Sequence, residues 1–234
     1  MAQNLIALAI TFALALGWLR LNDFTAHRGW ISSDLSRKII HMGTGPIFVL
    51  CWLLFQNTTG ARYLASLVPL AITAQFFLVG IGKIGDEAAV KAMSRNGDRR
   101  EILKGPLYYG IVFVVITSLL WYDTPIGILA LMLMCGGDGL ADILGRRYGK
   151  RKIFWNRQKS WIGSLGMFAG GWIFALIILG VYIAAGIFSG PITTYIPAIT
   201  IIALLATLVE TLPLKDVDNI TITITAMVFG FLLL

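Results

Sequence analysis

Charged residues are scarce in this chain. Only 13% of its 234 residues are Asp, Glu, Lys or Arg, whereas 57% are hydrophobic and the mean hydropathy is +0.80. Soluble domains contain roughly a quarter charged residues. The scarcity of charge therefore excludes an ordinary soluble domain, and we expect an integral membrane protein.

Cysteine is also rare, and the motifs of soluble nucleotide enzymes and hydrolases are missing. Cys51 and Cys135 form no C-x-x-C pair, which argues against a disulfide framework and a zinc site. The sequence contains no G-x-x-x-x-G-K-[ST], no H-R-D with D-F-G, no G-x-S-x-G and no H-E-x-x-H. Any nucleotide site in this chain is therefore not of a soluble-enzyme type.

Apolar runs of membrane-spanning length recur along the whole sequence. Because roughly 20 apolar residues cross a hydrocarbon core of about 30 Å, we predict a single all-α, polytopic membrane domain over 1–234 with about seven or eight transmembrane helices. The predicted spans are 4–19, 39–55, 63–82, 105–122, 125–144, 161–187, 194–213 and 220–234. The last run is short, and its opening ITITIT also suits a strand, so its crossing of the membrane is left open.

The loops between the predicted spans differ sharply in charge. All 19 Lys and Arg residues except Arg62, and all 12 acids except Asp123, fall on one side. Basic loops are retained in the cytoplasm, so we predict that the first span begins outside and that the functional face is cytoplasmic. Retention of basic loops in the cytoplasm also explains the net charge of +7, so we expect no nucleic-acid partner.

The N-terminal run 5–19 has no basic residue before it and no small-residue cleavage pattern after it. We expect a retained first helix rather than a signal peptide. A transit peptide rich in Ser and Arg is also missing, which favours a bacterial or an already mature protein, in a bacterial inner or a thylakoid-type membrane. In the longest polar segment, 83–104, DEAAVKAM predicts a short surface helix and SRNGD a turn.

Two aspartates, Asp138 and Asp142, end the fifth apolar run. At positions i and i+4 they share one helix face, and two carboxylates with open positions suit Mg²⁺ that carries nucleotide phosphates. The alternative is that each aspartate pairs with a nearby Arg. Glycines around them allow a backbone to approach a ligand closely; these are Gly136, Gly137, Gly139 and Gly145.

A basic run without any acid follows from Arg146 to Lys159. Some of its members suit phosphate binding, although contacts with lipid headgroups explain most of them equally well. Lys159 and Ser160 open the sixth span in KSWIGS, where backbone N–H groups at a helix N-terminus favour an anion. Gly166 and Gly170 form the G-x-x-x-G pattern of helix packing.

Three further polar clusters map to the same predicted face. They contain Arg37, Lys38 and His41; Glu101 and Lys104; and Glu210, Asp218 and Asn219. His41 is either a general base or phosphate donor, or an interface histidine that is merely hydrogen-bonded. Tyr108 and Tyr109 are typical of an aromatic belt.

These segments resemble the successive motifs of the phytol kinase family, within the polyprenol kinases that include dolichol kinase. The matching segments are RKIIHMGTG, SRNGDRREILKGPLYYG, GGDGLADILGRRYGK, NRQKSWIGSLGMF and ETLPLKDVDN. The resemblance implies a membrane enzyme that phosphorylates phytol or a related isoprenoid alcohol, such as geranylgeraniol or farnesol, in the bilayer. It also implies CTP as the phosphoryl donor and Mg²⁺ as the cofactor.

The resemblance further implies roles for individual residues. Asp138, Asp142 and Glu210 would be metal ligands, with Asp138, Asp142, His41 and Lys159 catalytic. The nucleotide would be held by Gly136, Gly137, Gly139, Arg146, Arg147, Ser160, Lys38, Lys104, Glu101, Asp218 and Asn219. Two alternatives stay open: a lipid cytidylyltransferase, which would release pyrophosphate from CTP, and a membrane transporter. The transporter is disfavoured because the acids cluster at helix ends rather than near the bilayer midplane.

Overall fold

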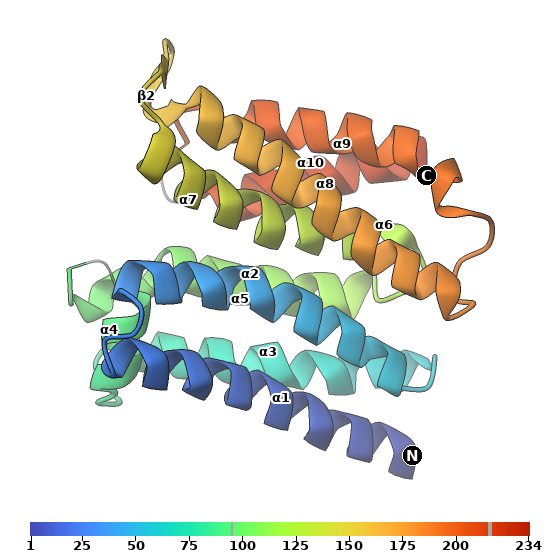
Figure 1. Cartoon of the computed structure of the whole chain (residues 1–234). Coiled ribbons are helices and arrows are strands. Elements are labelled where there is room, and N and C mark those ends of the chain that lie inside the picture. Colours follow the sequence, from blue (N-terminus) through green and yellow to red (C-terminus); the bar gives the residue numbers. More distant parts are fainter. Residues whose placement is uncertain (95, 215–216) are drawn as a thin grey trace. The chain divides into compact units, whose positions relative to one another are not determined.

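The computed structural model describes residues 1–94, 96–214 and 217–234, and the chain forms two compact units, Met1–Leu119 and Leu120–Leu234. Both are helical, which confirms the predicted all-α class (Figure 1). Five stretches are long and apolar enough to cross a membrane: Ala2–His27, Thr59–Gly80, Arg99–Leu119, Pro125–Tyr148 and Trp161–Ala184. The chain is therefore a polytopic membrane protein.

The first unit consists of five α-helices and two short 3₁₀ turns in its described part. In order these are α1 (Ala2–His27), α2 (Ser33–Cys51), η1 (Trp52–Leu54), α3 (Thr59–Gly80), α4 (Glu87–Met93), η2 (Arg99–Leu103) and α5 (Gly105–Leu119). Helix α1 packs against α2 and α3, and α3 packs against α5. Ser32 caps α2 by accepting a hydrogen bond from the Leu35 N–H, and Asp86 caps α4 through the Ala89 N–H.

The surface helix predicted from DEAAVKAM is α4, and it closes the polar end of the first unit. Ala92 and Met93 of α4 pack with Ile40, Phe76 and Ile102 in a buried cluster. Gly97 has a φ of +77°, as the Asn-Gly turn requires. The predicted turn also includes Arg95, which lies outside the described residues.

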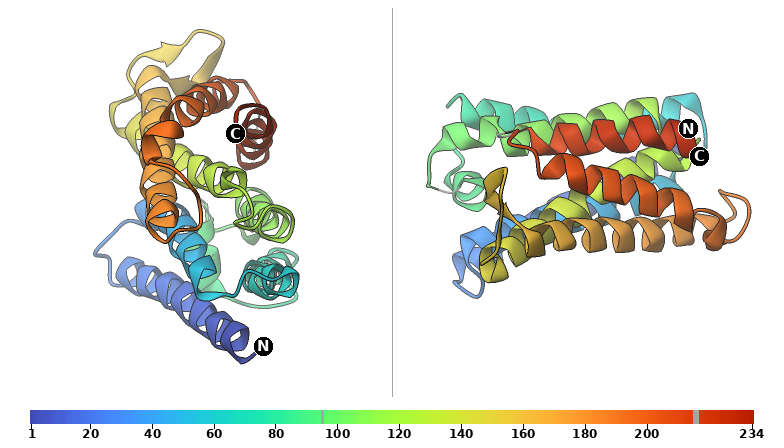
Figure 2. Two further views of the ribbon diagram at one scale, coloured as in Figure 1. Left: turned by 90° about the vertical axis from the view of Figure 1, so that its right-hand side faces the viewer. Right: turned by 90° about the horizontal axis from the view of Figure 1, so that it is seen from above.

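The second unit is built around one long, buried helical stretch. It runs through α6 (Pro125–Met132), the π-helical segment η3 (Leu133–Asp138) and α7 (Gly139–Tyr148). Around it lie α8 (Trp161–Ala184), η4 (Ile192–Thr194), α9 (Ile196–Glu210) and α10 (Asp218–Leu233). Helix α8 packs along η3 and α7, and α9 and α10 lie side by side (Figure 2). The residues from Ile126 to Gly137 are all buried.

The segment ITITIT is helical, not a strand. It belongs to α10, where the hydroxyls of Thr223 and Thr225 donate to the carbonyl oxygens four residues earlier, at 2.7 and 2.8 Å. These bonds satisfy the hydroxyls inside an apolar helix, so β-branching does not prevent helix formation here. The membrane crossing of 220–234 stays a prediction.

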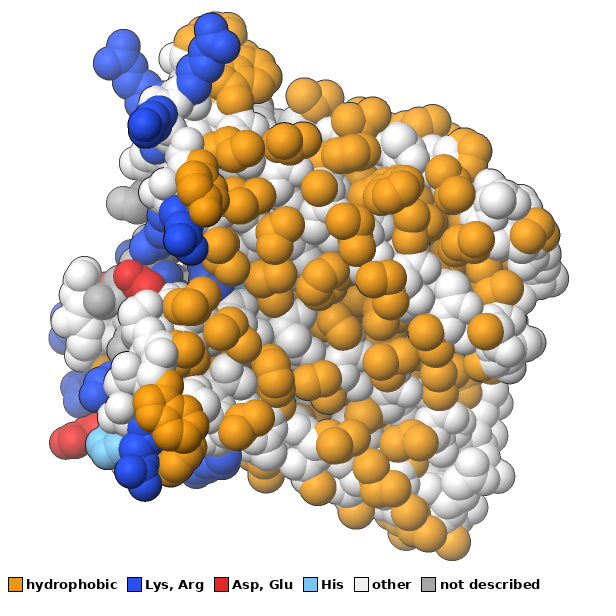
Figure 3. Space-filling view, in the orientation of Figure 1, with side chains coloured by type: hydrophobic (Ala, Val, Ile, Leu, Met, Phe, Trp, Pro, Cys, Tyr) orange, Lys and Arg blue, Asp and Glu red, His pale blue; other side chains and the backbone are white. Residues whose placement is uncertain are grey.

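The sequence did not predict the short antiparallel hairpin between α7 and α8. Its strands are β1 (Lys152–Ile153) and β2 (Asn156–Ser160), joined by a turn at Phe154 and Trp155. The hairpin stands at the end of the second unit where α7 ends and α8 begins (Figure 1). In both units the Lys and Arg side chains gather at helix ends, and most of the visible helical surface is hydrophobic (Figure 3).

Candidate active site

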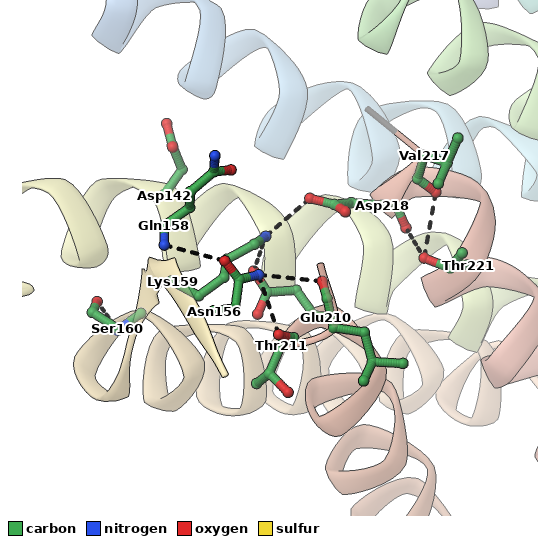
Figure 4. Close-up of polar contacts among 12 residues, drawn as sticks. Asp142, Asn156, Gln158, Lys159, Ser160, Glu210, Thr211, Val217, Asp218 and Thr221 are labelled. Carbon is green, nitrogen blue, oxygen red and sulfur yellow. Dashed lines mark hydrogen bonds and ion pairs between the residues drawn. The ribbon is translucent and has the colours of Figure 1, made fainter. Parts of the chain in front are cut away.

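Lys159 is the centre of a charged cluster in the second unit. Its ammonium donates to a carboxylate oxygen of Glu210 and to Oδ2 of Asp218, the latter at 2.9 Å (Figure 4). The three residues come from β2, the end of α9 and the start of α10. The fold therefore brings together residues that are more than fifty positions apart in sequence.

Glu210 is the most buried member of this cluster, with only 3% of its side chain exposed. Its Oε2 atom is buried and has no hydrogen-bond partner among the described residues. The charges of Asp138 and Asp218 both act on this carboxyl group. Two carboxylates thus bind the Lys159 ammonium, and the charge of a third, Asp138, reaches Glu210, so carboxylates outnumber the ammonium in this cluster.

The charge state of Lys159 follows from these neighbours. Burial alone would lower the pKa of its ammonium, but the carboxylates of Glu210 and Asp218 outweigh burial and raise the pKa above its ordinary value. Lys159 is therefore a fixed positive charge at physiological pH. Its predicted place in the active site is consistent with this geometry, although in the structure it contacts carboxylates.

Asn156 ties the hairpin to the end of α9. Its amide donates to the carbonyl oxygens of Thr211 and Leu212 at 3.2 and 3.3 Å, and its Oδ1 accepts from the Gln158 N–H at 3.1 Å. The Trp155 indole also donates to the Thr211 hydroxyl at 3.2 Å. These bonds fix Lys159 beside Glu210. Sequence reasoning missed Asn156 and Thr211, because only the tertiary fold brings them together.

Asp142 points away from the Lys159 ammonium (Figure 4). It accepts a hydrogen bond from Nε of Arg146 at 2.8 Å, one turn further along α7. This is the arginine pairing that the sequence offered as an alternative to metal binding. Asp138, at the end of η3, is the aspartate whose charge reaches Glu210.

The glycines near Asp138 are packed against α8. A Cβ atom on Gly136 would meet the Phe174 ring and the Gly170 carbonyl, and one on Gly137 would meet Met167. Gly170 in turn lies against the Gly136 carbonyl, which confirms the packing role of the G-x-x-x-G pattern. Close helix contact thus accounts for Gly136 and Gly137, and Gly139 is buried as well. Their contact with a nucleotide stays a prediction.

Helix α8 begins within KSWIGS, where the sixth span was predicted to open, and Ser160 is its N-cap. Its hydroxyl oxygen accepts from the Gly163 N–H at 3.2 Å, and Ser160 is buried. Arg146 and Arg147 are exposed on α7, with the Arg147 guanidinium 5.5 Å from the centre of the Tyr148 ring. Their predicted phosphate contacts stay predictions.

In the first unit, His41 is held by Tyr109. The Tyr109 hydroxyl donates to the His41 carbonyl oxygen at 2.6 Å, and the two ring centres lie 4.4 Å apart. Tyr109 therefore has a structural role, because it holds the α2 residue His41 against α5. The aromatic-belt pattern in the sequence did not predict this contact. His41 is half-buried, and Lys38 lies one turn before it on the same helix.

Glu101 accepts from the amide of Asn96 at 3.0 Å and so holds the turn that precedes η2. Lys104 is exposed at the start of α5. In the second unit, Asn219 lies in the first turn of α10, beside Asp218. The predicted contacts of these three residues with the nucleotide stay predictions.

No group of three or more His, Cys, Asp or Glu side chains in the described residues is arranged to hold a metal ion by itself. Mg²⁺ bound to a nucleotide needs only one or two protein carboxylates, because phosphate oxygens and water complete its shell. The unpartnered Oε2 of Glu210, with Asp138 nearby, supplies hard oxygen donors of this kind. The residues present therefore fit Mg²⁺.

Comparisons with known proteins identify relatives along almost the entire chain. It is 39% identical to the probable chloroplastic phytol kinase of Triticum aestivum over 229 residues, covering 97% of this chain and 76% of the relative. It is 36% identical to phytol kinase 1 of Arabidopsis thaliana over 223 residues, covering 94% and 72%. It is 37% identical to the farnesol kinase of Arabidopsis thaliana over 236 residues, covering 99% and 76%.

No protein-family model matches the chain, and no solved structure matches it. The resemblance noted from the sequence motifs thus extends over both structural units, and the relatives are named as kinases of prenyl alcohols. The chain belongs to the phytol kinase family.

Proposed function

We propose that this protein is a membrane kinase that transfers the terminal phosphate of CTP to phytol or a related isoprenoid alcohol. The single observation that carries the proposal is its identity of 36–39%, along nearly the whole chain, with relatives named phytol kinase and farnesol kinase. The charged cluster of Lys159, Glu210, Asp218 and Asp138 supports the second unit as the place of reaction. CTP itself comes from the family resemblance.

The cluster suits a nucleotide that arrives with a divalent cation. Three carboxylates and one ammonium repel a bare triphosphate, whereas Mg²⁺ on the triphosphate would give the carboxylates a cation to bind. Asp138 and Glu210 would hold the ion, and Asp142 would join them on release from Arg146. Bound there, Mg²⁺ would neutralise charge on the phosphate oxygens.

The residues of the chain would position the two substrates for in-line transfer. Phosphoryl transfer depends mainly on positioning and on neutralised charge. Lys159 keeps its carboxylates in place and offers its positive charge to the transferred phosphoryl group, and Arg146 and Arg147, exposed on α7, would bind the other phosphates. The prenyl tail lies among lipid-facing helices, and its hydroxyl reaches the polar helix ends. A carboxylate of the cluster or His41 would accept the alcohol proton.

The polar helix ends lie at the cytoplasmic face in this proposal, with the N-terminus on the other side. The support is the charge of the loops, because Lys and Arg in short loops stay in the cytoplasm. Both units form one functional enzyme in this proposal, in keeping with the single domain predicted over 1–234.

The test of the proposal is product identification with purified protein. CTP, ATP, GTP and UTP, each radiolabelled, are offered in turn with phytol, geranylgeraniol and farnesol. We expect prenyl monophosphate and CDP. Release of pyrophosphate with a cytidylylated lipid would instead establish a cytidylyltransferase, and ion flux in liposomes without nucleotide consumption would establish a transporter.

A second experiment tests the carboxylates. Asp138→Asn should lower kcat by about 10²-fold or more, because it removes a charge that faces the reacting phosphates. Asp142→Asn should lower kcat by a similar factor if Asp142 leaves Arg146 to bind the ion. In that case Arg146→Gln should lower kcat less than either aspartate variant does. If both aspartate variants fold and retain near-normal turnover, the metal assignment is wrong.

A further inference from the structure

The hairpin between α7 and α8 presents an aromatic and basic surface that the proposed reaction does not use. Phe154, at its tip, is 82% exposed, Trp155 is 42% exposed and Trp161 is 53% exposed. Their rings touch edge to face, with centres 4.3 Å apart for Phe154 and Trp155 and 6.3 Å apart for Trp155 and Trp161. These three side chains form one continuous exposed aromatic cluster.

The opposite face of the hairpin is packed against the protein, so the exposed aromatic side chains belong to an ordered element. Ile153 is fully buried, and Asn156 and Ser160 are nearly so. Asn156 also bonds to the end of α9 through Thr211 and Leu212. The fold therefore holds one face of the hairpin inward and the aromatic cluster outward.

Four basic side chains flank the aromatic cluster. Lys150, Arg151, Lys152 and Arg157 are all exposed, and the sequence from 146 to 159 contains no Asp or Glu. In Figure 3 an orange patch lies beside blue side chains at the upper left corner, where Figure 1 places β2. Aromatic and cationic groups thus occupy one small element.

The depth of the hairpin relative to a bilayer follows from its neighbours in the chain. It joins the candidate spans Pro125–Tyr148 and Trp161–Ala184 directly, with only 149–160 between them. The element therefore emerges at headgroup depth. Trp and Phe are favoured there because their rings leave water, and Lys and Arg are attracted by anionic headgroups.

We propose that the exposed face of the hairpin is an interfacial anchor that binds anionic lipid. Phe154, Trp155 and Trp161 enter the headgroup region, and Lys150, Arg151, Lys152 and Arg157 contact lipid phosphates. The occupant is the surface of the bilayer that holds the enzyme. The anchoring does not depend on the proposed reaction, so it can hold or fail independently of kinase activity.

The test places a reporter at the tip of the hairpin. Cys51 and Cys135 are buried, so Phe154→Cys can be labelled selectively with an environment-sensitive dye. The labelled full chain is placed in nanodiscs of phosphatidylcholine alone, or of phosphatidylcholine and phosphatidylglycerol in equal parts. We expect a blue shift of emission and reduced quenching by acrylamide, a neutral quencher, when phosphatidylglycerol is present.

Two controls make the result specific. Ser189→Cys, in the exposed connection between α8 and α9, should report the same water exposure in both lipid mixtures. The combined substitution of Lys150, Arg151 and Lys152 by Gln, which leaves Lys159 and Arg157 in place, should abolish the lipid-dependent shift at position 154 without changing the helical content. A label at 154 that is equally accessible to acrylamide in both mixtures would overturn the proposal. So would reversal of the shift by added inorganic triphosphate, which would assign the basic face to a soluble anion.

Discussion

At the scale of single residues, Lys159 holds the charged cluster together. Breaking a buried ion pair by removing one partner costs about 3–5 kcal/mol, because the other charge stays buried without compensation. Lys159→Met leaves the Glu210 carboxylate, whose side chain is 3% exposed, buried without its compensating charge. We expect the variant to lose activity and to unfold about 3 kcal/mol more easily, as measured by denaturation in detergent.

A double variant separates stability from chemistry. Lys159→Met combined with Glu210→Gln removes both members of the buried pair, so most of the lost stability should return. Activity should not return, because the variant still lacks the positive charge proposed to act on the phosphoryl group and the proposed metal ligand Glu210. Recovery of turnover in the double variant would contradict a role for Lys159 in the reaction. Asp218→Asn should be much milder for stability, since Asp218 is 27% exposed.

The pH dependence of stability provides an independent check on Lys159. Its pKa is raised in the folded protein, so its contribution is complete below the unfolded-state pKa of about 10.4 and is lost only above the folded pKa. The difference in unfolding free energy between the wild type and Lys159→Met should therefore be constant from pH 7 to about 9. A decrease of this difference within that range would mean that Lys159 loses its proton there.

The sequence identifies the charged residues of the cluster but not which of them pair with one another. Asp138, Lys159, Glu210 and Asp218 all stand out as polar residues at the ends of apolar runs. Their pairing depends on the packing of α8, α9 and α10, which no local pattern encodes. The Asn156 bond to α9 is hidden for the same reason, since an Asn in a polar loop has no distinctive spacing.

At the scale of elements, the glycines between η3 and α8 set how closely two helices approach. A Cβ atom on Gly170 would collide with the backbone carbonyl of Gly136, which cannot move aside as a side chain can. Gly170→Ala should therefore destabilise the protein by about 1–3 kcal/mol. Thermal unfolding in detergent, followed by circular dichroism, measures the effect.

Gly180 on the same helix is the matched control. A Cβ atom there would meet nothing within 4 Å. Gly180→Ala should be neutral or slightly stabilising, because alanine is the better helix former by about 1 kcal/mol. Equal effects of the two substitutions would show that helix propensity, and not the contact with Gly136, decides the outcome.

The lengths of the apolar runs predicted the long helices well, but the sequence predicted the irregular elements poorly. The spans near 63–82, 125–144 and 161–187 correspond to helical stretches because long apolar runs permit little else in a membrane. The hairpin was missed because its strands contain only two and five residues, too few for an alternation to stand out in a basic loop. The π-helical turn before Asp138 also has no sequence signature beyond its glycines.

At the scale of the whole molecule, the order and direction of the membrane-spanning stretches predict on which side of the bilayer the polar helix ends of each unit lie. In the first unit α5 begins at the polar end and runs away from it, and in the second the stretch from α6 to α7 runs toward the polar end. Each stretch is long enough to cross the membrane. We therefore expect the polar ends of both units to face the same side of the bilayer.

Cysteine labelling in sealed vesicles tests this topology. Cys51 and Cys135 are buried, so single cysteines introduced at exposed sites are the ones that react with a membrane-impermeant maleimide. Arg100→Cys and Arg151→Cys, at the polar ends of the first and second units, should react from the same side. Asn57→Cys and Ser189→Cys, at the opposite helix ends, should react from the other side. If Arg100→Cys and Arg151→Cys label from opposite sides, an odd number of crossings separates them, and residues of the first unit such as His41 cannot share an active site with Lys159.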